Sequence, residues 1–298
     1  MMQGFYRVFY SNTVNQVWRF IFYPFRKILP ISLKVPVRGI VDIPLLNDRL
    51  IIESNESSHL SKFLYWNGCE AFEYSKRFFP LIQKVNCFLD VGANFGYYSL
   101  AAAKLNPNCK IIAFEPGNGP SHFLKRNIKL NKLEANVRAE KLAVSDRKQV
   151  LEFTEYYHPK YAYLDLQMSA LGNLGTKEVN QPAHKYKVDC ITLDDYCKEH
   201  ALSPELIKID TEGNETAVFA GAQRIISTHR PMMLVEVLKD YCEEVVEELS
   251  KSHGYGIFDI TGNDLTKIES FATLNHKRKM DVLLIPNEKA DQILSIIR

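Results

Sequence analysis

Apolar and polar positions follow two alternating patterns from about residue 87 to the end of the chain. Short apolar runs predict buried strands. These runs are Cys87–Leu89, Cys109–Glu115, Val137–Val144, Gln149–Phe153, Leu206–Asp210, Met233–Val237, Tyr255–Ile260 and Met280–Ile285. Several segments between them, such as Gly119–Asn131 and Thr216–Ala220, carry apolar residues at helical spacing. Strands therefore alternate with helices, which predicts an α/β fold with a doubly wound sheet.

The first forty residues have a different pattern, with six basic residues, no acidic residue and many aromatics. Apolar residues fall at helical spacing at Val14, Trp18, Ile21, Phe22 and Phe25. Arg19 and Arg26 interrupt any run of the ~20 apolar residues that a transmembrane helix needs. Two interpretations of residues 1–30 stay open: a helix lying on an anionic membrane surface, or a helix packed on the domain or on a second copy in a homodimer.

Upstream of the α/β pattern, Val35–Leu46 and Leu50–Ile52 predict short edge strands or a linker. Ser57–Trp66 and Glu70–Lys84 have helical patterns. We therefore predict an N-terminal extension over residues 1–69, followed by one domain over residues 70–298.

Composition narrows the function classes. The formal net charge of +2 is too close to zero to favour nucleic-acid binding by bulk electrostatics. None of the six cysteines has the C-x-x-C spacing of a zinc site, and the set does not predict a disulfide framework. We expect reduced, mostly buried thiols in a cytoplasmic protein, with peripheral contact at the inner membrane face as an open alternative.

The motif Asp90-Val91-Gly92-Ala93-Asn94-Phe95-Gly96 follows the first buried run and precedes a helical pattern. Gly92 and Gly96 lack Cβ atoms, so the backbone can turn sharply and a ligand can approach it. Asn94 stands where a dinucleotide fingerprint has its middle glycine. Asp90 would repel a pyrophosphate and suits a cationic ligand, such as the ammonium and sulfonium of S-adenosylmethionine. Glu115 ends the next strand, where a carboxylate can accept both hydroxyls of a ribose.

Three stretches resemble the motifs of the FkbM family of S-adenosylmethionine-dependent methyltransferases. They are the motif from Asp90 to Gly96, the tripeptide Phe114-Glu115-Pro116, and Ile207-Lys208-Ile209-Asp210-Thr211-Glu212-Gly213. The resemblance covers the chain from about Glu70 onward. It implies a Rossmann-like class I methyltransferase fold, with a mostly parallel seven-stranded sheet flanked by helices. It also implies a set of residues around S-adenosylmethionine, with the last two near the adenine: Asp90, Gly92, Asn94, Gly96, Glu115, Val144 and Ser145.

Three carboxylates are candidates for catalysis, Asp210, Glu212 and Glu236, because each would lie at the carboxyl end of a central strand. An alcohol that accepts a methyl group must lose a proton, so a nearby base helps. Two alternatives for Asp210 and Glu212 are turn capping and metal binding. We disfavour a metal because one residue separates the two acids and no further ligands are evident. His158 and His184 are alternative bases on a loop.

We therefore predict an O-methyltransferase acting on a hydroxyl of a saccharide or of a glycosylated or secondary metabolite. The irregular stretch Thr154–Lys187 contains Tyr156, Tyr157, Tyr161 and Tyr163, and such rings suit sugar faces or simply cover the core. The alternatives are a nicotinamide-dependent oxidoreductase and a non-catalytic, membrane-associated scaffold. A nucleic-acid amino-methyltransferase is disfavoured because the chain has no Pro-Pro dipeptide.

Overall fold

The computed structural model describes residues 10–168, 172–173, 180–238, 241–262, 264–274 and 279–297. Residues 1–9 of the basic, aromatic N-terminus lie outside the described residues. So do Ser169, Gly175 and most of their neighbours in the long stretch before Lys187.

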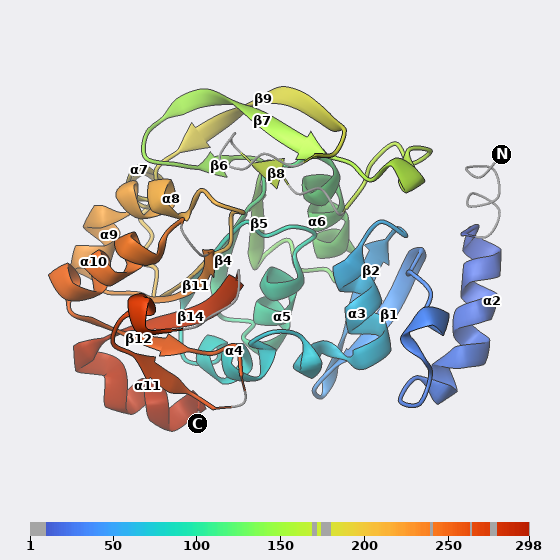
Figure 1. Cartoon of the computed structure of the whole chain (residues 1–298), viewed down its shortest axis with the longest axis horizontal. Helices are drawn as coiled ribbons and strands as arrows, with labels where there is room; N and C mark the ends of the chain where they lie inside the picture. Colours follow the sequence, from blue (N-terminus) through green and yellow to red (C-terminus); the bar gives the residue numbers. More distant parts are fainter. Residues whose placement is uncertain are drawn as a thin grey trace.

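The central sheet has eight strands among the described residues, in the order β13-β12-β14-β11-β10-β3-β4-β5 (Figure 1). Their bounds are β3 Cys87–Val91, β4 Lys110–Phe114, β5 Val137–Glu140, β10 Leu206–Ile209, β11 Met232–Leu238, β12 Tyr255–Asp259, β13 Thr266–Ile268 and β14 Lys279–Pro286. The pairings from β11 through β5 are parallel, and β14, β12 and β13 pair antiparallel. The predicted doubly wound α/β fold is confirmed. Because β13 is only three residues long and mostly exposed, it has no clear apolar pattern, and the predicted seven-stranded sheet gains this eighth strand at its edge.

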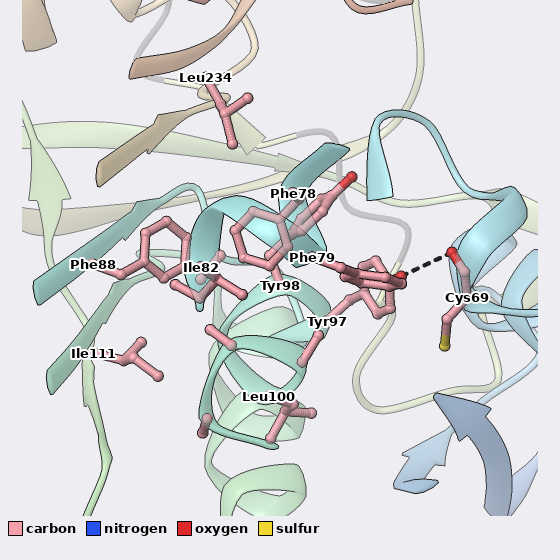
Figure 2. Close-up of a cluster of buried hydrophobic side chains, with 14 of the residues drawn as sticks. Cys69, Phe78, Phe79, Ile82, Phe88, Tyr97, Tyr98, Leu100, Ile111 and Leu234 are labelled. Carbon is pink, nitrogen blue, oxygen red and sulfur yellow. Dashed lines mark hydrogen bonds between the residues drawn. The ribbon is translucent and has the colours of Figure 1, made fainter. Parts of the chain in front are cut away.

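Helices cover both faces of the sheet because successive strand side chains point to opposite faces. Phe88 packs in one apolar cluster and the next residue, Leu89, packs in another. The helices of the first face are α4 Ser75–Ile82, α5 Tyr97–Leu105, α6 Asn118–Leu130 and α11 Ala290–Ile297. Those of the second face are α7 Leu193–Glu199, α8 Glu215–Ala220, α9 Gln223–His229 and α10 Glu243–His253. Figure 2 shows aromatic rings of α4 and α5 lying between Phe88 and Cys69. Phe78 contacts Phe88, with ring centroids 5.4 Å apart, and the Tyr97 hydroxyl donates to the Cys69 carbonyl at 3.0 Å.

A second, four-stranded sheet lies beyond the carboxyl ends of the central strands, at the top of Figure 1. It contains β6 Ala143–Val144, β7 Gln149–Tyr156, β8 Gly172–Asn173 and β9 Ala183–Ile191. The predicted single strand Val137–Val144 is therefore wrong, because its two ends, β5 and β6, belong to different sheets. The stretch Thr154–Lys187 is also more regular than predicted: β7 runs to Tyr156 and pairs with β9 from Ala183. Cross-strand contacts such as Lys185 with Glu152, 2.9 Å apart, hold this exposed pair together.

The N-terminal segment contains α2 Asn12–Phe22, the short helices η1 Tyr23–Phe25 and η2 Ile31–Leu33, the hairpin β1 Gly39–Leu45 and β2 Asp48–Ser54, α3 His59–Asn67 and η3 Cys69–Ala71. The remaining short helices are η4 Pro159–Tyr161, η5 Phe271–Thr273 and η6 Asn287–Lys289. The hairpin buries Ile43, Leu45 and Leu50 completely, in the same apolar cluster as Phe88. Residues 39–54 thus share their core with the rest of the chain, and the boundary at residue 69 stays a prediction. Among the described residues, no helix is long and apolar enough to cross a membrane.

Candidate active site

A cavity of about 460 Å³ lies at the carboxyl ends of the central strands, beside the four-stranded sheet. Seven of the ten predicted site residues line it: Gly92, Asn94, Glu115, Val144, Asp210, Glu212 and Glu236. The other three, Asp90, Gly96 and Ser145, do not line it. Gly96 begins α5 and packs on Leu124, while the Ser145 backbone N–H donates to the Ile191 carbonyl at 2.8 Å.

The turn after β3 needs its first glycine. Gly92 has φ +79°, and a Cβ atom there would lie 1.8 Å from the Asp210 carbonyl oxygen. Any side chain would therefore collide with the backbone that follows β10, besides straining φ. The backbone N–H groups of Gly92 and Ala93 donate to the Phe114 carbonyl at 3.0 Å. The turn is thus held between the ends of two neighbouring strands, with its backbone facing the cavity.

Glu115, at the end of β4, connects two loops of the cavity wall. Its carboxylate accepts from the backbone N–H of Asn94 and of Gly117, both at 2.8 Å. Burial raises the pKa of Glu115 to about 7, against the lowering effect of these two hydrogen bonds. The carboxylate therefore faces the cavity in the predicted position, already oriented by backbone donors.

Asp90 lies behind the cavity wall and is fully buried. The Ser99 hydroxyl donates to its Oδ2 at 2.6 Å, and the Lys208 ammonium lies 3.7 Å from its Oδ1. Lys208 Nζ also lies 3.1 Å from Asp210 Oδ2 and donates to the Gly92 carbonyl at 3.3 Å. The buried lysine thus joins β3, its glycine turn and β10. In this geometry Asp90 contacts Lys208 and Ser99 rather than the cavity.

A second lysine organises the far side of the cavity. Lys279, the first residue of β14, pairs with Glu236 of β11 and lies 3.7 Å from Glu73 Oε1. The Tyr98 hydroxyl donates to the other oxygen of Glu73 at 3.2 Å. Strand register explains the pairing with Glu236, because Lys279 and Asp281 lie opposite Leu238 and Glu236 in the antiparallel ladder.

Acids outnumber bases in this cluster, which we call the carboxylate cluster: Glu73, Asp90, Asp210, Glu236 and Asp281, around Lys208 and Lys279. Three of the five carboxylates, those of Asp90, Glu236 and Asp281, are buried, whereas those of Asp210 and Glu73 are partly exposed. Two ammonium groups cannot neutralise all five, so some carboxyl groups hold protons near neutral pH. Burial and then the charge of Asp210 raise the pKa of Glu236 to about 9. Burial opposes ionisation of Asp210 too, but Lys208 and Lys279 outweigh it, and the pKa of Asp210 lies below its usual value.

Glu212 lines the cavity in a left-handed turn conformation, with φ +56°. The turn is capped by a different acid, Glu215, whose Oε1 accepts from the Thr211 and Gly213 N–H groups at 2.9 and 3.2 Å. The capping role considered for Asp210 and Glu212 thus falls to a residue that the sequence interpretation did not single out.

The histidines and tyrosines of the stretch Thr154–Lys187 differ in where they lie relative to the cavity. His158 lines the cavity, whereas His184 stacks on Tyr157 outside it. None of the four loop tyrosines lines the cavity. Tyr161 is buried, and the Tyr163 hydroxyl donates to Glu56 at 2.5 Å. These contacts match the alternative in which the rings cover the core, so the tyrosines no longer support a saccharide acceptor.

Sequence reasoning missed Lys208, Lys279 and Glu73 as site residues. Lys208 carried a signal, since a lysine inside the apolar run Leu206–Ile209 needs a buried acid as partner. Lys279 and Glu73 carried none, because they reach the site only through tertiary packing. Among the described residues, no group of three or more His, Cys, Asp or Glu side chains is placed to hold a metal ion.

The residues present fit S-adenosylmethionine. The backbone of the glycine turn lines the cavity through Gly92 and Asn94, and Glu115 offers a carboxylate there that could accept the hydroxyls of a ribose. Phe114, Leu142 and Val144 supply an apolar wall for a flat base. The ionised carboxylate of Asp210 complements a cationic ligand.

The chain is similar to known methyltransferases. A family model described as the methyltransferase FkbM domain matches residues 90–257, more than half of the chain. The 31-O-demethyl-FK506 methyltransferase FkbM of Streptomyces tacrolimicus is 28% identical over 153 residues, covering 45% of this chain and 58% of that protein. Methyltransferase sdnD of Sordaria araneosa is 28% identical over 152 residues, covering 45% of this chain and 59% of that protein. The chain thus matches less than two thirds of the length of these curated relatives.

Among solved structures, the chain is similar to methyltransferase FkbM from Methylobacillus flagellatus. The sequences are 13% identical, the match covers 67% of this chain and 43% of that chain, and the TM-score is 0.43. That likeness is remote, and the assignment rests on the motifs and the family model. The glycine turn after β3, Glu115 after β4 and Asp210 after β10 lie around one cavity. Because the family model also matches residues 90–257, the chain belongs to the FkbM family of S-adenosylmethionine-dependent methyltransferases.

Proposed function

We propose that this chain transfers a methyl group from S-adenosylmethionine to a hydroxyl of a saccharide or of a glycosylated or secondary metabolite. The observation that carries the proposal is geometric: Asp210 and Glu236 line one cavity from adjacent strands, and each contacts its own lysine, with Lys208 3.1 Å from Asp210 and Lys279 beside Glu236. Two carboxylates that are held in different surroundings within one cavity can take different acid–base roles. The Streptomyces relative supports an oxygen acceptor, since its name refers to a substrate lacking a methyl group on an oxygen.

Gly92, Asn94 and Glu115 would hold the nucleoside part of the cofactor. When bound, S-adenosylmethionine supplies a methyl group already activated by its sulfonium. The protein then has to place the acceptor and to receive its proton. Cofactor contacts of Asp90, Gly96 and Ser145, which do not line the cavity, stay predictions. Each of these residues would affect cofactor binding through its backbone or through a residue that it contacts.

Glu236 is our candidate base. In its ionised form it can take the proton of an acceptor hydroxyl, and its raised pKa makes it a stronger base than an ordinary carboxylate. Asp210 stays ionised beside Lys208 and orients the acceptor. Glu212, on the rim of the same cavity, supports this orientation. Lys279 contacts Glu236 and stabilises the ionised carboxylate once Glu236 has released the proton that it took from the acceptor hydroxyl.

The test is transfer of radiolabelled methyl groups from S-adenosylmethionine into a fractionated extract of the producing organism. We expect label in glycans or small molecules. Label only in protein or nucleic acid would overturn the proposal. Binding of S-adenosylhomocysteine without transfer to any fraction would support the non-catalytic scaffold instead.

Once an acceptor is found, Glu236→Gln should lower turnover by between about 100-fold and 10,000-fold, the usual contribution of a general base. Affinity for S-adenosylhomocysteine should stay near that of the wild type. In the wild type, kcat/KM should rise with pH as Glu236 ionises, and the variant should lose this dependence. Glu269→Gln, on the surface, is the matched control. Normal turnover of Glu236→Gln would exclude Glu236 as the base.

A further inference from the structure

Exposed large apolar side chains are concentrated on α2 and the short helices that follow it. Of twelve such side chains among the described residues, eight lie between residues 14 and 33. Phe20, Ile28 and Ile31 are 82%, 81% and 81% exposed. Single exposed apolar residues are ordinary on protein surfaces, but a contiguous group of this kind marks an interaction site.

Helix α2 also directs its polar side toward the protein. Asn15 and Arg19 are its buried residues. The Asn15 amide donates to the Pro36 carbonyl at 2.8 Å, and Arg19 Nη2 donates to the Arg38 carbonyl at 3.0 Å. A surface helix of a water-soluble domain normally buries its apolar side and exposes its polar side. The opposite orientation of α2 leaves the apolar side available for a partner that is itself apolar.

The charges next to this apolar face identify the partner. Arg26, Lys27 and Lys34 lie along the same segment, and the first acidic residue of the chain is Asp42. A basic border around an apolar face complements anionic lipid headgroups above acyl chains. A second copy of the chain fits less well, because a symmetric contact would bring the basic residues of both copies together.

We propose that the apolar face formed by α2, η1 and η2 docks peripherally on an anionic lipid bilayer. Phe20, Phe25, Ile28 and Ile31 enter the boundary between headgroups and acyl chains, while the exposed Lys27 contacts the headgroups. The contact needs no spanning helix, and it leaves the polar hydrogen bonds of Asn15 and Arg19 with the protein intact.

The experiment is co-sedimentation of the full-length protein with vesicles of phosphatidylcholine containing phosphatidylglycerol, and with vesicles of phosphatidylcholine alone. The wild type should bind the anionic vesicles and release them at high salt. The variant Phe20→Ser/Ile28→Ser should bind at least about tenfold more weakly, because two large side chains no longer leave water. Val150→Ser removes an exposed apolar side chain from the other end of the molecule and should bind like the wild type.

Circular dichroism shows whether each variant is folded, and size-exclusion chromatography without lipid reports oligomeric state. A wild type that ignores anionic vesicles would overturn the proposal. So would equal vesicle binding by Phe20→Ser/Ile28→Ser, or a wild-type dimer that this variant converts to a monomer.

A second cavity, of about 450 Å³, carries an independent inference. It lies between residues 32–36, the first turn of α3 and η4, and Ser58 and His59 line both this cavity and the first one. Three lysines line it, Lys34, Lys62 and Lys160. Lys34 donates to Asn67 and Lys160 lies over the rings of Tyr10 and Tyr161. The acid of this cavity, Glu56, already pairs with Arg38 and accepts from Tyr163.

Lys62 is half-buried, and within the described part of the chain no acceptor pairs with its ammonium group. Burial, followed by repulsion from Lys160 and Lys34, lowers its pKa. An anion placed among the three lysines would relieve this repulsion. We infer that the second cavity binds an anionic group, such as a phosphate, of the acceptor whose hydroxyl reaches the first cavity. This inference rests on the proposed function.

The probe is inorganic pyrophosphate, titrated calorimetrically into the protein saturated with S-adenosylhomocysteine. Lys62→Gln should weaken pyrophosphate binding at least about tenfold, the usual value of one charge-assisted contact. The exposed Lys129→Gln should not change the affinity for pyrophosphate.

Glucose 1-phosphate and short-chain phosphatidic acid, used in turn, distinguish a soluble from a lipid source of the phosphate. Equal pyrophosphate affinity in wild type and Lys62→Gln would overturn the inference. Absence of methyl transfer by the wild type would instead contradict the proposed function.

Discussion

At the scale of single residues, Lys208 connects the glycine turn after β3 with the end of β10, which lie far apart in the sequence. Its ammonium group contacts Asp90 before the glycine turn, the Gly92 carbonyl within it, and Asp210 after the neighbouring strand. A buried lysine is costly unless it is paired, and here its single charge is shared between Asp90, which is fully buried, and Asp210, which is partly exposed. Lys208 therefore both joins β3 to β10 and supplies positive charge next to their acids.

Replacing Lys208 with methionine should lower the free energy of unfolding by about 3–5 kcal/mol, because the fully buried Asp90 would lose its counter-charge. Urea denaturation measures this change. Lys267→Met, which removes a lysine paired with Glu269 on the surface, should change it by no more than about 0.5 kcal/mol. A near-normal stability of Lys208→Met would mean that Asp90 and Asp210 share protons without help from the lysine.

Glu115 offers a residue-scale test of the cofactor site. Glu115→Gln keeps an acceptor for only one of the two backbone N–H groups, those of Asn94 and Gly117, and it removes the charge that would bind the ribose hydroxyls. Loss of a charge-assisted pair of about 1.5–3 kcal/mol should weaken S-adenosylhomocysteine about ten- to a hundredfold in calorimetry. The exposed Glu134→Gln should bind like the wild type. Unchanged affinity in Glu115→Gln would remove Glu115 from the predicted site.

At the scale of elements, the N-terminal segment divides into two parts that are held differently. Helix α2 is attached through polar contacts of Asn15 and Arg19, with most of its apolar side outside. The β1–β2 hairpin is instead attached through fully buried apolar residues. The backbone N–H groups of Glu53 and Ile51 in β2 also donate to the side-chain oxygens of Asn127 in α6 and of Asn131 at its C-terminal end. The predicted extension therefore contains one peripheral element and one core element.

This division predicts different consequences for stability. Ile43→Ala in β1 should cost about 2–5 kcal/mol in the free energy of unfolding, as for other large-to-small core changes. Deleting residues 1–28 should cost less than Ile43→Ala and leave S-adenosylhomocysteine binding intact. Thermal unfolding and calorimetry measure both effects. Aggregation of the truncated protein without lipid would instead indicate that α2 is needed for packing.

At the scale of the whole molecule, the excess of buried acids makes stability depend on pH. Burial raises the pKa of Glu236 to about 9, and it raises those of Glu115 and Asp281 to about 7. The folded protein therefore holds protons that the unfolded chain releases above about pH 4.5. This contribution to stability is fully present below that pH and is lost as the pH rises through 7 and then 9.

We expect the free energy of unfolding to fall steadily between pH 5 and pH 9 in urea titrations. Glu236→Gln, which keeps the shape of the side chain but cannot ionise, should flatten the decline between pH 7 and pH 9. The decline between pH 5 and pH 7 should remain, because Glu115 and Asp281 are unchanged. An equally steep decline of the variant above pH 7 would show that Glu236 is ionised in the folded protein at neutral pH.

Local pattern was sufficient to predict the central sheet and its glycine turn. Buried parallel strands are continuous apolar runs, and a turn with φ +79° after such a run leaves few residues besides glycine. The β7–β9 pair was harder to predict beyond Phe153. Its exposed face is polar, and its strands are recognisable mainly by their pairing with each other.

The amino-acid sequence by itself determined the α/β alternation, the family motifs and the three candidate acids at strand ends, because all of these are patterns within single elements. Only the tertiary structure decided that Lys208 and Lys279 pair with those acids, that Asp90 lies behind the cavity wall, and that the apolar side of α2 faces outward. Each of these depends on which elements meet in space. The same apolar spacing describes a helix whichever way it faces, and a charge gains its pKa shift only from neighbours that the fold brings to it.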